Sequence, residues 1–233
     1  YMGLELGLSV PIAWGLSLQG AVSLGDYIYT SNPEFTQMID NSATDVVHSR
    51  VNWKGMKVES TPQTAINVGL NFRGPNNWFA SVDFNYYDRL YLSMNPMYRT
   101  EYLANEIKRI YDWNNLETGR QKAYVVGIID EIRQQEDLGN AYTLSASIGK
   151  NFRIKYKYTL GFSLQVNNIL NNQRIRTGGY EQMRLNKLSD PIIFPNADGE
   201  MKIIKKPTTY SRFDSKYFYM NGINYYLNIY FRF

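Results

Sequence analysis

Apolar and polar residues alternate along seven long stretches of this chain, and this period of two constrains the fold more than any other feature. Successive side chains of a β-strand point to opposite faces of a sheet, so a strict alternation predicts a strand with one apolar face. The last stretch places Ile223, Tyr225, Leu227, Ile229, Phe231 and Phe233 on one face. The seven predicted strands are 3–10, 14–25, 65–73, 78–94, 142–152, 158–167 and 223–233.

Two properties of these stretches distinguish them from the strands of a soluble sandwich. Strands of globular proteins average about five or six residues, and several of these are nearly twice as long. The polar face is rich in Gly, Ser, Asn and Gln and poor in Lys and Glu. A crowded, wet lumen suits that composition better than open solvent does, so the pattern favours the wall of a transmembrane barrel.

The predicted connections alternate between short and long. The short ones lie at 11–13, 74–77 and 153–157, and the long ones at 31–55, 96–138 and 171–215. Short periplasmic turns and long extracellular loops are the pattern of outer-membrane barrels. Within the long loops, apolar residues recur at helical spacing in 101–113 and 123–135, and the segment 190–201 has the composition of a turn or small hairpin. We therefore expect an all-β, antiparallel up-and-down transmembrane barrel whose loops contain short helices.

Aromatic residues at the strand ends support this interpretation. A membrane barrel carries aromatic girdles at both interfaces, facing the lipid. Six aromatic residues on the outward face lie beside the short connections, namely Trp14, Phe72, Trp78, Phe152, Tyr158 and Phe233. Tyr142, Tyr217 and Tyr219 occupy outward positions at the opposite ends. A general preference of aromatic residues for strands is the simpler explanation, but it does not account for one parity at both ends.

Composition argues against several other classes of protein. The 233 residues include no cysteine, which excludes disulfides and thiolate metal sites, and His48 is the only histidine. No nucleophile motif accompanies His48, which we read as a solvated loop residue, so we expect neither an enzyme nor a cofactor or metal site. The net charge of +4 is spread along the chain, which gives no indication of nucleic-acid binding.

Several short motifs resemble a known family. They are "TPQT" at 61–64, "NPMYRT" at 95–100, "NNILNN" at 167–172, "GGYEQ" at 178–182 and the terminal strand. Together they resemble the C-terminal barrel strands of TonB-dependent outer-membrane receptors in the form common in Bacteroidetes, in particular the subtype with a carboxypeptidase-regulatory-like N-terminal domain. The likeness extends over nearly the whole chain.

The resemblance implies a 22-stranded barrel with an N-terminal plug and a TonB-box segment. Seven strands alone would leave two bare edges in the bilayer, so we expect residues 1–233 to be the C-terminal portion of one barrel domain, without the plug and the N-terminal strands. The expected location is the bacterial outer membrane. The expected partners are the lipid bilayer, the barrel assembly machinery and the TonB system through the absent N-terminal part; the sequence does not decide whether a surface lipoprotein lid is a further partner.

Charged and aromatic residues on the inward face are the candidate functional residues. Glu5, Arg73, Asp83 and Arg89 have inward parity, and Arg89 and Tyr91 are expected near the outer mouth. Gly178 and Gly179 would permit a tight loop over the lumen, followed by Tyr180. For the charges, mutual pairing or contact with a plug is favoured over contact with substrate; for the glycines, a purely structural turn is the favoured alternative.

The terminal aromatics are expected to have a second role. The resemblance implies that barrels of this kind end in an aromatic residue recognised by the assembly machinery, which would assign Phe231 and Phe233 as an assembly signal. The function that follows is active import of a nutrient such as an oligosaccharide or peptide. Two alternatives are a passive porin-like or structural barrel and a soluble carbohydrate-binding sandwich. The apolar parity of every strand argues against the sandwich.

Overall fold

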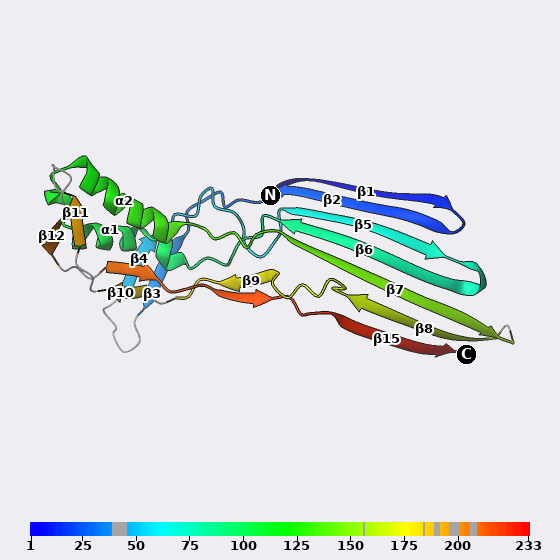
Figure 1. Cartoon of the computed structure of the whole chain (residues 1–233). Helices are drawn as coiled ribbons and strands as arrows, with labels where there is room; N and C mark the ends of the chain where they lie inside the picture. The colour runs from blue at the N-terminus through cyan, green and yellow to red at the C-terminus, as the bar shows by residue number, and fades with distance from the viewer. Residues whose placement is uncertain (39–45, 156, 184, 189–191, 196–200, 206–208) are drawn as a thin grey trace.

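The seven long strands form one antiparallel sheet. The computed structural model describes residues 1–38, 46–155, 157–183, 185–188, 192–195, 201–205 and 209–233. Each strand pairs with the next long strand along the chain, in the order β1-β2-β5-β6-β7-β8-β15 (Figure 1). Their bounds are Met2–Ala13, Leu16–Asp26, Thr64–Arg73, Trp78–Asp88, Ala141–Ile154, Tyr158–Asn167 and Asn224–Arg232. The predicted number of long strands and their antiparallel arrangement are thus confirmed.

The register keeps apolar residues beside one another across the sheet. Leu16 pairs with Phe72, which pairs with Ala80, and the row continues through Ile148 and Leu164 to Leu227. The next row along the strands, beginning at Ser17 and Asn71, is polar in the same way. Because the side-chain period is two, a slip of one residue would exchange the two faces, so this pattern specifies the register.

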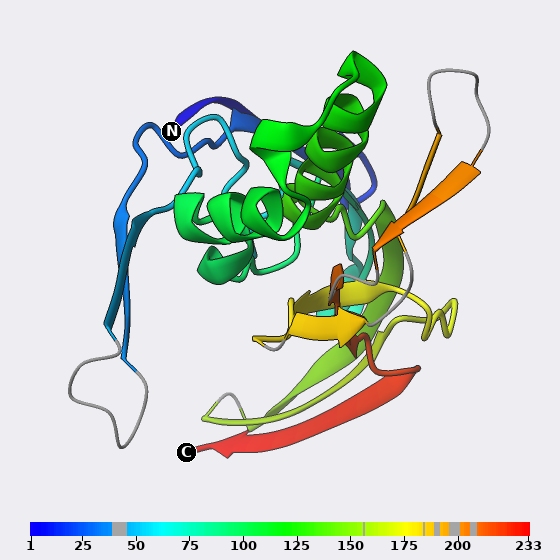
Figure 2. The same cartoon turned by 90° about the vertical axis from the view of Figure 1, so that its left-hand side faces the viewer.

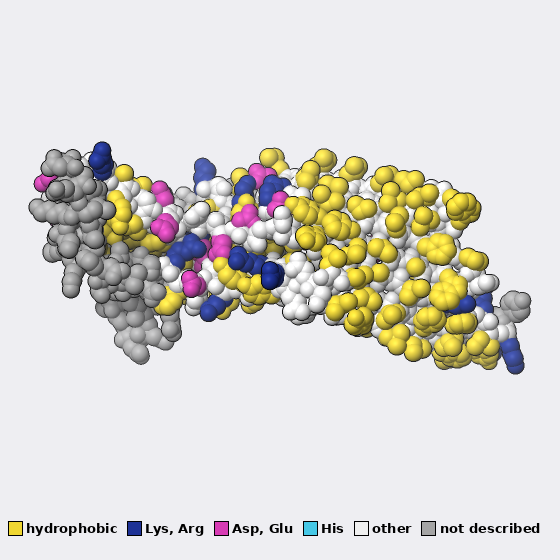
Figure 3. Space-filling view, viewed as in Figure 1, with side chains coloured by type: hydrophobic (Ala, Val, Ile, Leu, Met, Phe, Trp, Pro, Cys, Tyr) yellow, Lys and Arg dark blue, Asp and Glu magenta, His cyan; other side chains and the backbone are white. Residues whose placement is uncertain are grey.

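The two faces of the sheet differ in polarity and in curvature. Viewed nearly along the strands, the sheet is bent into an open arc, and the side seen in Figure 1 is its convex side (Figure 2). Hydrophobic side chains cover this convex face over the whole length of the strands (Figure 3). They are exposed: Leu6, Leu227 and Ile229 retain 69%, 61% and 66% of their accessible surface. The concave face carries the Ser, Asn, Gln and Gly of the alternation.

Both edges of the sheet are open. In the described residues β1 and β15 each pair with a single strand of this sheet, and these strands do not close into a barrel. No helix in the described part of the chain is long and apolar enough to span a membrane.

All short connections lie at one end of the sheet and all long ones at the other (Figure 1). At the short end, β1 runs on through Pro11–Ala13, so the turn predicted at 11–13 is instead formed by Trp14 and Gly15. Both have positive φ, 49° and 81°, as a two-residue hairpin turn with the correct twist requires. A Cβ on Gly15 would lie 2.0 Å from the carbonyl oxygen of Arg73, so only glycine fits there.

The long connections fold into a separate layer beyond the sheet, which we call the loop layer (Figures 1 and 2). It contains helices α1 (Glu101–Ile110) and α2 (Gly119–Arg133), the short 3₁₀ helices Pro96–Arg99 and Trp113–Asn115, and four small two-stranded sheets. The paired strands are β3 (Glu34–Met38) with β4 (Val46–Arg50), β9 (Arg176–Tyr180) with β14 (Lys216–Tyr219), β10 (Leu185–Leu188) with β13 (Thr209–Arg212), and β11 (Ile192–Pro195) with β12 (Met201–Lys205).

The two helices bury the only large hydrophobic cluster in the described residues. Leu103, Ala104 and Ile107 of α1 face Val125, Ile129 and Ile132 of α2, with Tyr98 and Tyr111 completing the cluster. The predicted helices are confirmed, although α2 begins four residues earlier than predicted. Its start is set by a capping box in which Thr118 and Gln121 bond each other's backbone amides.

Two other predictions about the loops need correction. The strand predicted to extend to Met94 ends at Asp88, because Arg89 adopts a left-handed conformation with φ of 55° that turns the chain out of the sheet. Three of the four small sheets were not predicted. The hairpin suspected within 190–201 exists as β11 and β12, while its central residues 196–200 lie outside the described residues.

Candidate functional site

Two of the sequence motifs meet in a buried polar network at the base of the loop layer. Arg99 of "NPMYRT" is fully buried and donates from Nη1 to Oε2 of Glu181 at 2.5 Å and from Nη2 to Oε1 at 2.7 Å. Glu181 belongs to "GGYEQ" and is 4% exposed. The backbone amide of Asn95 donates to the same carboxylate at 2.8 Å. This bidentate geometry is the strongest arrangement available to the pair.

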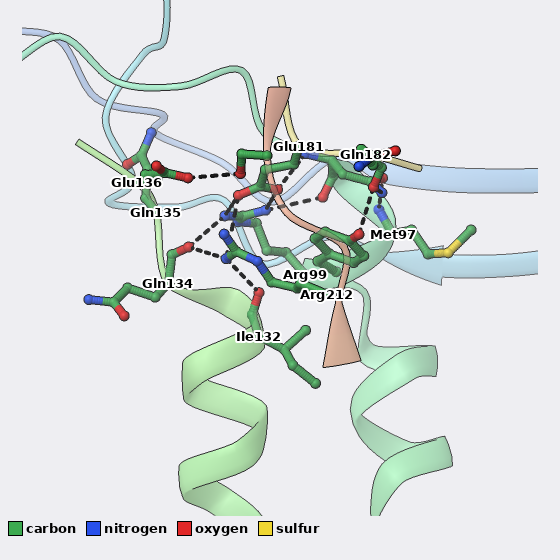
Figure 4. A network of polar contacts seen from close by, with 12 residues as sticks. Met97, Arg99, Ile132, Gln134, Gln135, Glu136, Glu181, Gln182 and Arg212 are labelled. Atoms are coloured by element: carbon green, nitrogen blue, oxygen red, sulfur yellow. Dashed lines mark hydrogen bonds and ion pairs between the residues drawn. The ribbon is translucent and has the colours of Figure 1, made fainter. Parts of the chain in front are cut away.

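The network extends to the end of α2 and to β13 (Figure 4). The carbonyl of Gln134 accepts from Nη2 of Arg99 at 3.0 Å and from Nη1 of Arg212 at 2.8 Å. Arg212 also lies 3.6 Å from Glu181. Two arginines therefore share one carboxylate and one helix-terminal carbonyl. Sequence reasoning did not single out Arg99, Glu181 or Arg212, although the first two stand within the motifs and the motifs were the available signal.

Further contacts join the same two segments. The hydroxyl of Tyr98 donates to the carbonyl of Gln182 at 2.6 Å, and the side-chain amide of Asn95 donates to it at 3.0 Å. Burial raises the pKa of Tyr98, and the nearby charge of Glu181 acts in the same direction. Both effects keep the hydroxyl protonated, so it stays a donor in this contact.

Gly179 is required by the same packing, whereas Gly178 is not. A Cβ on Gly179 would lie 2.0 Å from the carbonyl oxygen of Lys216 and 2.9 Å from a methyl group of Leu92, and its φ is +146°. A Cβ on Gly178 would have its nearest contact at 3.7 Å. Both glycines thus lie in strand β9 and not in the predicted tight loop or turn, and Gly179 is the one whose missing side chain allows pairing with β14. Tyr180 is 48% exposed and packs edge-on against Phe218.

A second polar cluster surrounds Glu136. Its carboxylate accepts from the hydroxyls of Ser215, at 2.8 Å, and Tyr217, and it lies 3.6 Å from Arg176. The hydrogen bond to Glu136 raises the pKa of Tyr217, and the guanidinium of Arg176 lies over the tyrosine ring at 4.1 Å. Tyr217 and Tyr219 belong to β14, outside the seven-stranded sheet, and the hydroxyl of Tyr217 is engaged in the loop layer.

Residues in or near the remaining motifs make hydrogen bonds where the long connections leave the sheet. Arg89 donates to the hydroxyl of Thr64 and to the carbonyls of Gly25 and Gln63 at 2.8–3.2 Å. In "NNILNN", Asn168 is 3% exposed and donates to the carbonyls of Asn172 and Asn221. Arg89 was predicted as an inward charge, but its guanidinium donates these hydrogen bonds within the fold. Two residues further on, Tyr91 forms an isolated antiparallel β-bridge with Asp137.

The other predicted inward residues do lie on the concave face but are far apart along it. Glu5 accepts a hydrogen bond from Ser23 at 3.3 Å and lines an open hollow of about 440 Å³ together with Asn67, Asn85 and Tyr87. Asp83 lies in the middle of β6, opposite Gly69 and Ser145. A second hollow of about 520 Å³ near the short turns is lined by Arg73, Asn71, Asn151 and neighbours.

The aromatic residues predicted beside the short connections do lie there. Trp14 is in the turn and 95% exposed, while Phe72, Trp78, Phe152 and Tyr158 are on the convex face. Several of them touch: Tyr158 stacks on Phe231 at 5.7 Å, Phe231 is followed by Phe233 at 6.4 Å, and Phe152 stacks on Phe162 at 6.2 Å. Tyr142 stacks on Phe84 nearer the loop layer.

Within the described residues, no group of three or more His, Asp or Glu residues could hold a metal ion. His48 lies in β4, not in an irregular loop, and is exposed, with Nδ1 3.0 Å from the hydroxyl of Thr36.

No protein-family model, no curated protein and no solved structure matches this chain.

Proposed function

We propose that the chain supplies the C-terminal part of the wall and the extracellular loops of a TonB-dependent outer-membrane receptor of the Bacteroidetes type, which actively imports a nutrient such as an oligosaccharide or peptide. One observation carries this proposal: the curved sheet is apolar outside and polar inside. A water-soluble barrel or sandwich buries its apolar face, whereas here that face is convex and bare. A bilayer is the solvent that such a surface matches.

The arrangement of the loops supports the same function. Turns of a few residues join the strands at one end, and a folded layer that contains the buried ion pair of Arg99 and Glu181 lies at the other. Long loops fixed on a rigid scaffold are where binding residues concentrate in many proteins. In the proposed receptor this layer faces the medium and contributes to substrate capture, the concave face lines the lumen or contacts the plug, and the TonB system acts through the plug.

Single cysteines test the membrane assignment directly, because these 233 residues contain none and any cysteine elsewhere in the full-length protein can be replaced first. The full-length protein is reconstituted in bilayers with a nitroxide on one residue of each adjacent pair: Ser81 and Val82 in β6, Ser163 and Leu164 in β8. We expect labels at Val82 and Leu164 to be accessible to oxygen and shielded from a polar nickel chelate. Chelate access to these two positions equal to that at the serines contradicts the proposal.

Energy coupling needs a second measurement, since a passive barrel would give the same labelling pattern. Uptake by intact cells is expected to stop when the proton gradient of the inner membrane is dissipated. Uptake that continues, together with conductance of the purified protein across a planar bilayer, favours the passive alternative.

A further inference from the structure

The end of the sheet at the short connections is strongly basic. Six cationic residues lie in or beside the turns and strand ends there, and no Asp or Glu accompanies them: Arg73, Lys150, Arg153, Lys155, Lys157 and Arg232. Since the whole chain has 25 Lys and Arg against 21 Asp and Glu, the remainder carries a slight excess of acidic residues. The net positive charge of this chain therefore comes from the residues at one rim of the sheet.

Lys150 is unusual among the six because it stands on the apolar, convex face. It occupies a row between Trp78 of β6 and Phe162 of β8. Its ammonium lies 4.6 Å from the centre of the Trp78 ring and 4.9 Å from that of Phe152. No carboxylate forms an ion pair with Lys150 among the described residues, so its counter-charge must come from elsewhere.

An apolar hollow adjoins this ammonium on the same face. It has a volume of about 310 Å³ and is lined by Phe72, Trp78, Phe79, Ala80 and Ile148. Trp78 both lines the hollow and provides one of the two aromatic rings that contact the ammonium of Lys150. A cation beside an apolar groove, at the level of an aromatic girdle, combines the two requirements of a phospholipid: an anion for the headgroup and hydrocarbon contact for the chain.

We infer that Lys150, Trp78 and the hollow form a binding site for an anionic phospholipid, with the headgroup phosphate at the ammonium and an acyl chain in the hollow. This inference rests on the proposed function, since it needs the convex face to lie in a bilayer. An ammonium on a lipid-facing row is costly without an anion, and each Lys near an anionic surface strengthens its attraction.

At the opposite rim, the ends of β2 and β6 carry Asp26 and Asp88 on the convex face, and the ammonium of Lys57 is paired with Asp26 at 2.5 Å. Carboxylates at that level repel an anionic headgroup. The phospholipid bound at the proposed site therefore belongs to the leaflet of the bilayer that lies beside the short turns.

Quenching of Trp78 fluorescence by brominated phospholipids tests the site. The Trp14→Phe variant of the full-length protein leaves Trp78 as the tryptophan on the convex face of this sheet, because Trp53 and Trp113 lie in the loop layer; a further Trp78→Phe change identifies the part of the signal that belongs to Trp78. In bilayers of phosphatidylcholine, brominated phosphatidylglycerol is expected to bind near Trp78 about fivefold more strongly than brominated phosphatidylcholine. Lys150→Gln should bring this ratio close to one, and Lys150→Arg should preserve it.

Lys155→Gln is the matched control, because Lys155 is an exposed turn residue without a ring contact in the described structure. It should leave the ratio unchanged. An equal ratio in the parent and in Lys150→Gln, or an equal loss in Lys155→Gln, overturns the headgroup site. Failure of both brominated lipids to quench Trp78 would instead contradict the proposed function. Unchanged quenching by phosphatidylcholine in Lys150→Gln shows that the variant is folded.

Discussion

At the scale of single residues, the buried pair of Arg99 and Glu181 joins two segments of the loop layer that lie 82 residues apart in the sequence. Removing one member of a buried pair leaves the other charge without compensation, which costs about 3–5 kcal/mol. We expect Glu181→Gln to destabilise the loop layer by this amount, because Arg99 would then be buried with a neutral partner. Denaturant unfolding of the full-length protein, followed by proteolysis of the loops, measures the change.

Glu106→Gln provides a control of the same chemical type. Glu106 pairs with Arg109 one turn away on α1, and the arginine is exposed. Exposed pairs of this kind contribute roughly 0–1 kcal/mol. If the two variants lost equal stability, burial would not be what gives the Glu181 pair its importance.

The neighbouring glycines allow a second comparison at this scale. Gly179→Ala would place a methyl group 2.0 Å from the backbone of β14, whereas Gly178→Ala meets nothing closer than 3.7 Å. We expect Gly179→Ala to lower the free energy of unfolding by about 1–3 kcal/mol, through backbone strain and loss of β9–β14 pairing. Gly178→Ala should be nearly neutral. Thermal unfolding monitored in both variants distinguishes them, and equal effects would contradict this packing.

At the scale of elements, the sequence predicts the long strands well and the loops poorly. Strands such as 65–73 have a period of two because one face is apolar throughout, and this local signal survives in the sheet. The end of β6 at Asp88 depends on the left-handed Arg89, whose donors reach Thr64 and Gly25. No local pattern encodes such contacts. For the same reason the meeting of Arg99 with Glu181, 82 residues apart, was not predicted.

The stability of the helix pair α1 and α2 should decrease at alkaline pH because Tyr111 lies in its hydrophobic cluster. Burial raises the pKa of Tyr111 to about 12 from the ordinary 10.0, so the folded state favours the neutral hydroxyl. The resulting stabilisation is complete below pH 10 and is lost as the pH rises from 10 to 12. We expect α1 and α2 to unfold in this range and Tyr111→Phe to shift the midpoint upward, as measured by circular dichroism. Tyr102→Phe, a half-exposed position on α1, should leave the midpoint unchanged.

At the scale of the whole molecule, the edge strand β15 contacts its neighbours on both faces of the sheet, one apolar and one polar. On the convex face Phe231 stacks on Tyr158, and on the concave face Tyr230 donates to Asn151 at 2.5 Å. The family resemblance implies that Phe231 and Phe233 are recognised by the assembly machinery. If so, their loss should impair insertion into the membrane, a step that precedes substrate binding. In the proposed receptor, the defect should therefore concern the amount of protein in the membrane.

We expect the double variant Phe231→Ala, Phe233→Ala to lower the fraction of full-length protein recovered in the outer membrane several-fold, while the molecules that do insert keep their substrate affinity. Heat-modifiable migration of membrane fractions measures insertion, and binding per inserted molecule measures affinity. Tyr230→Phe, which changes the opposite face of the same strand, should insert normally because it keeps the aromatic ring. Normal insertion of the double variant would contradict the role of Phe231 and Phe233 as an assembly signal.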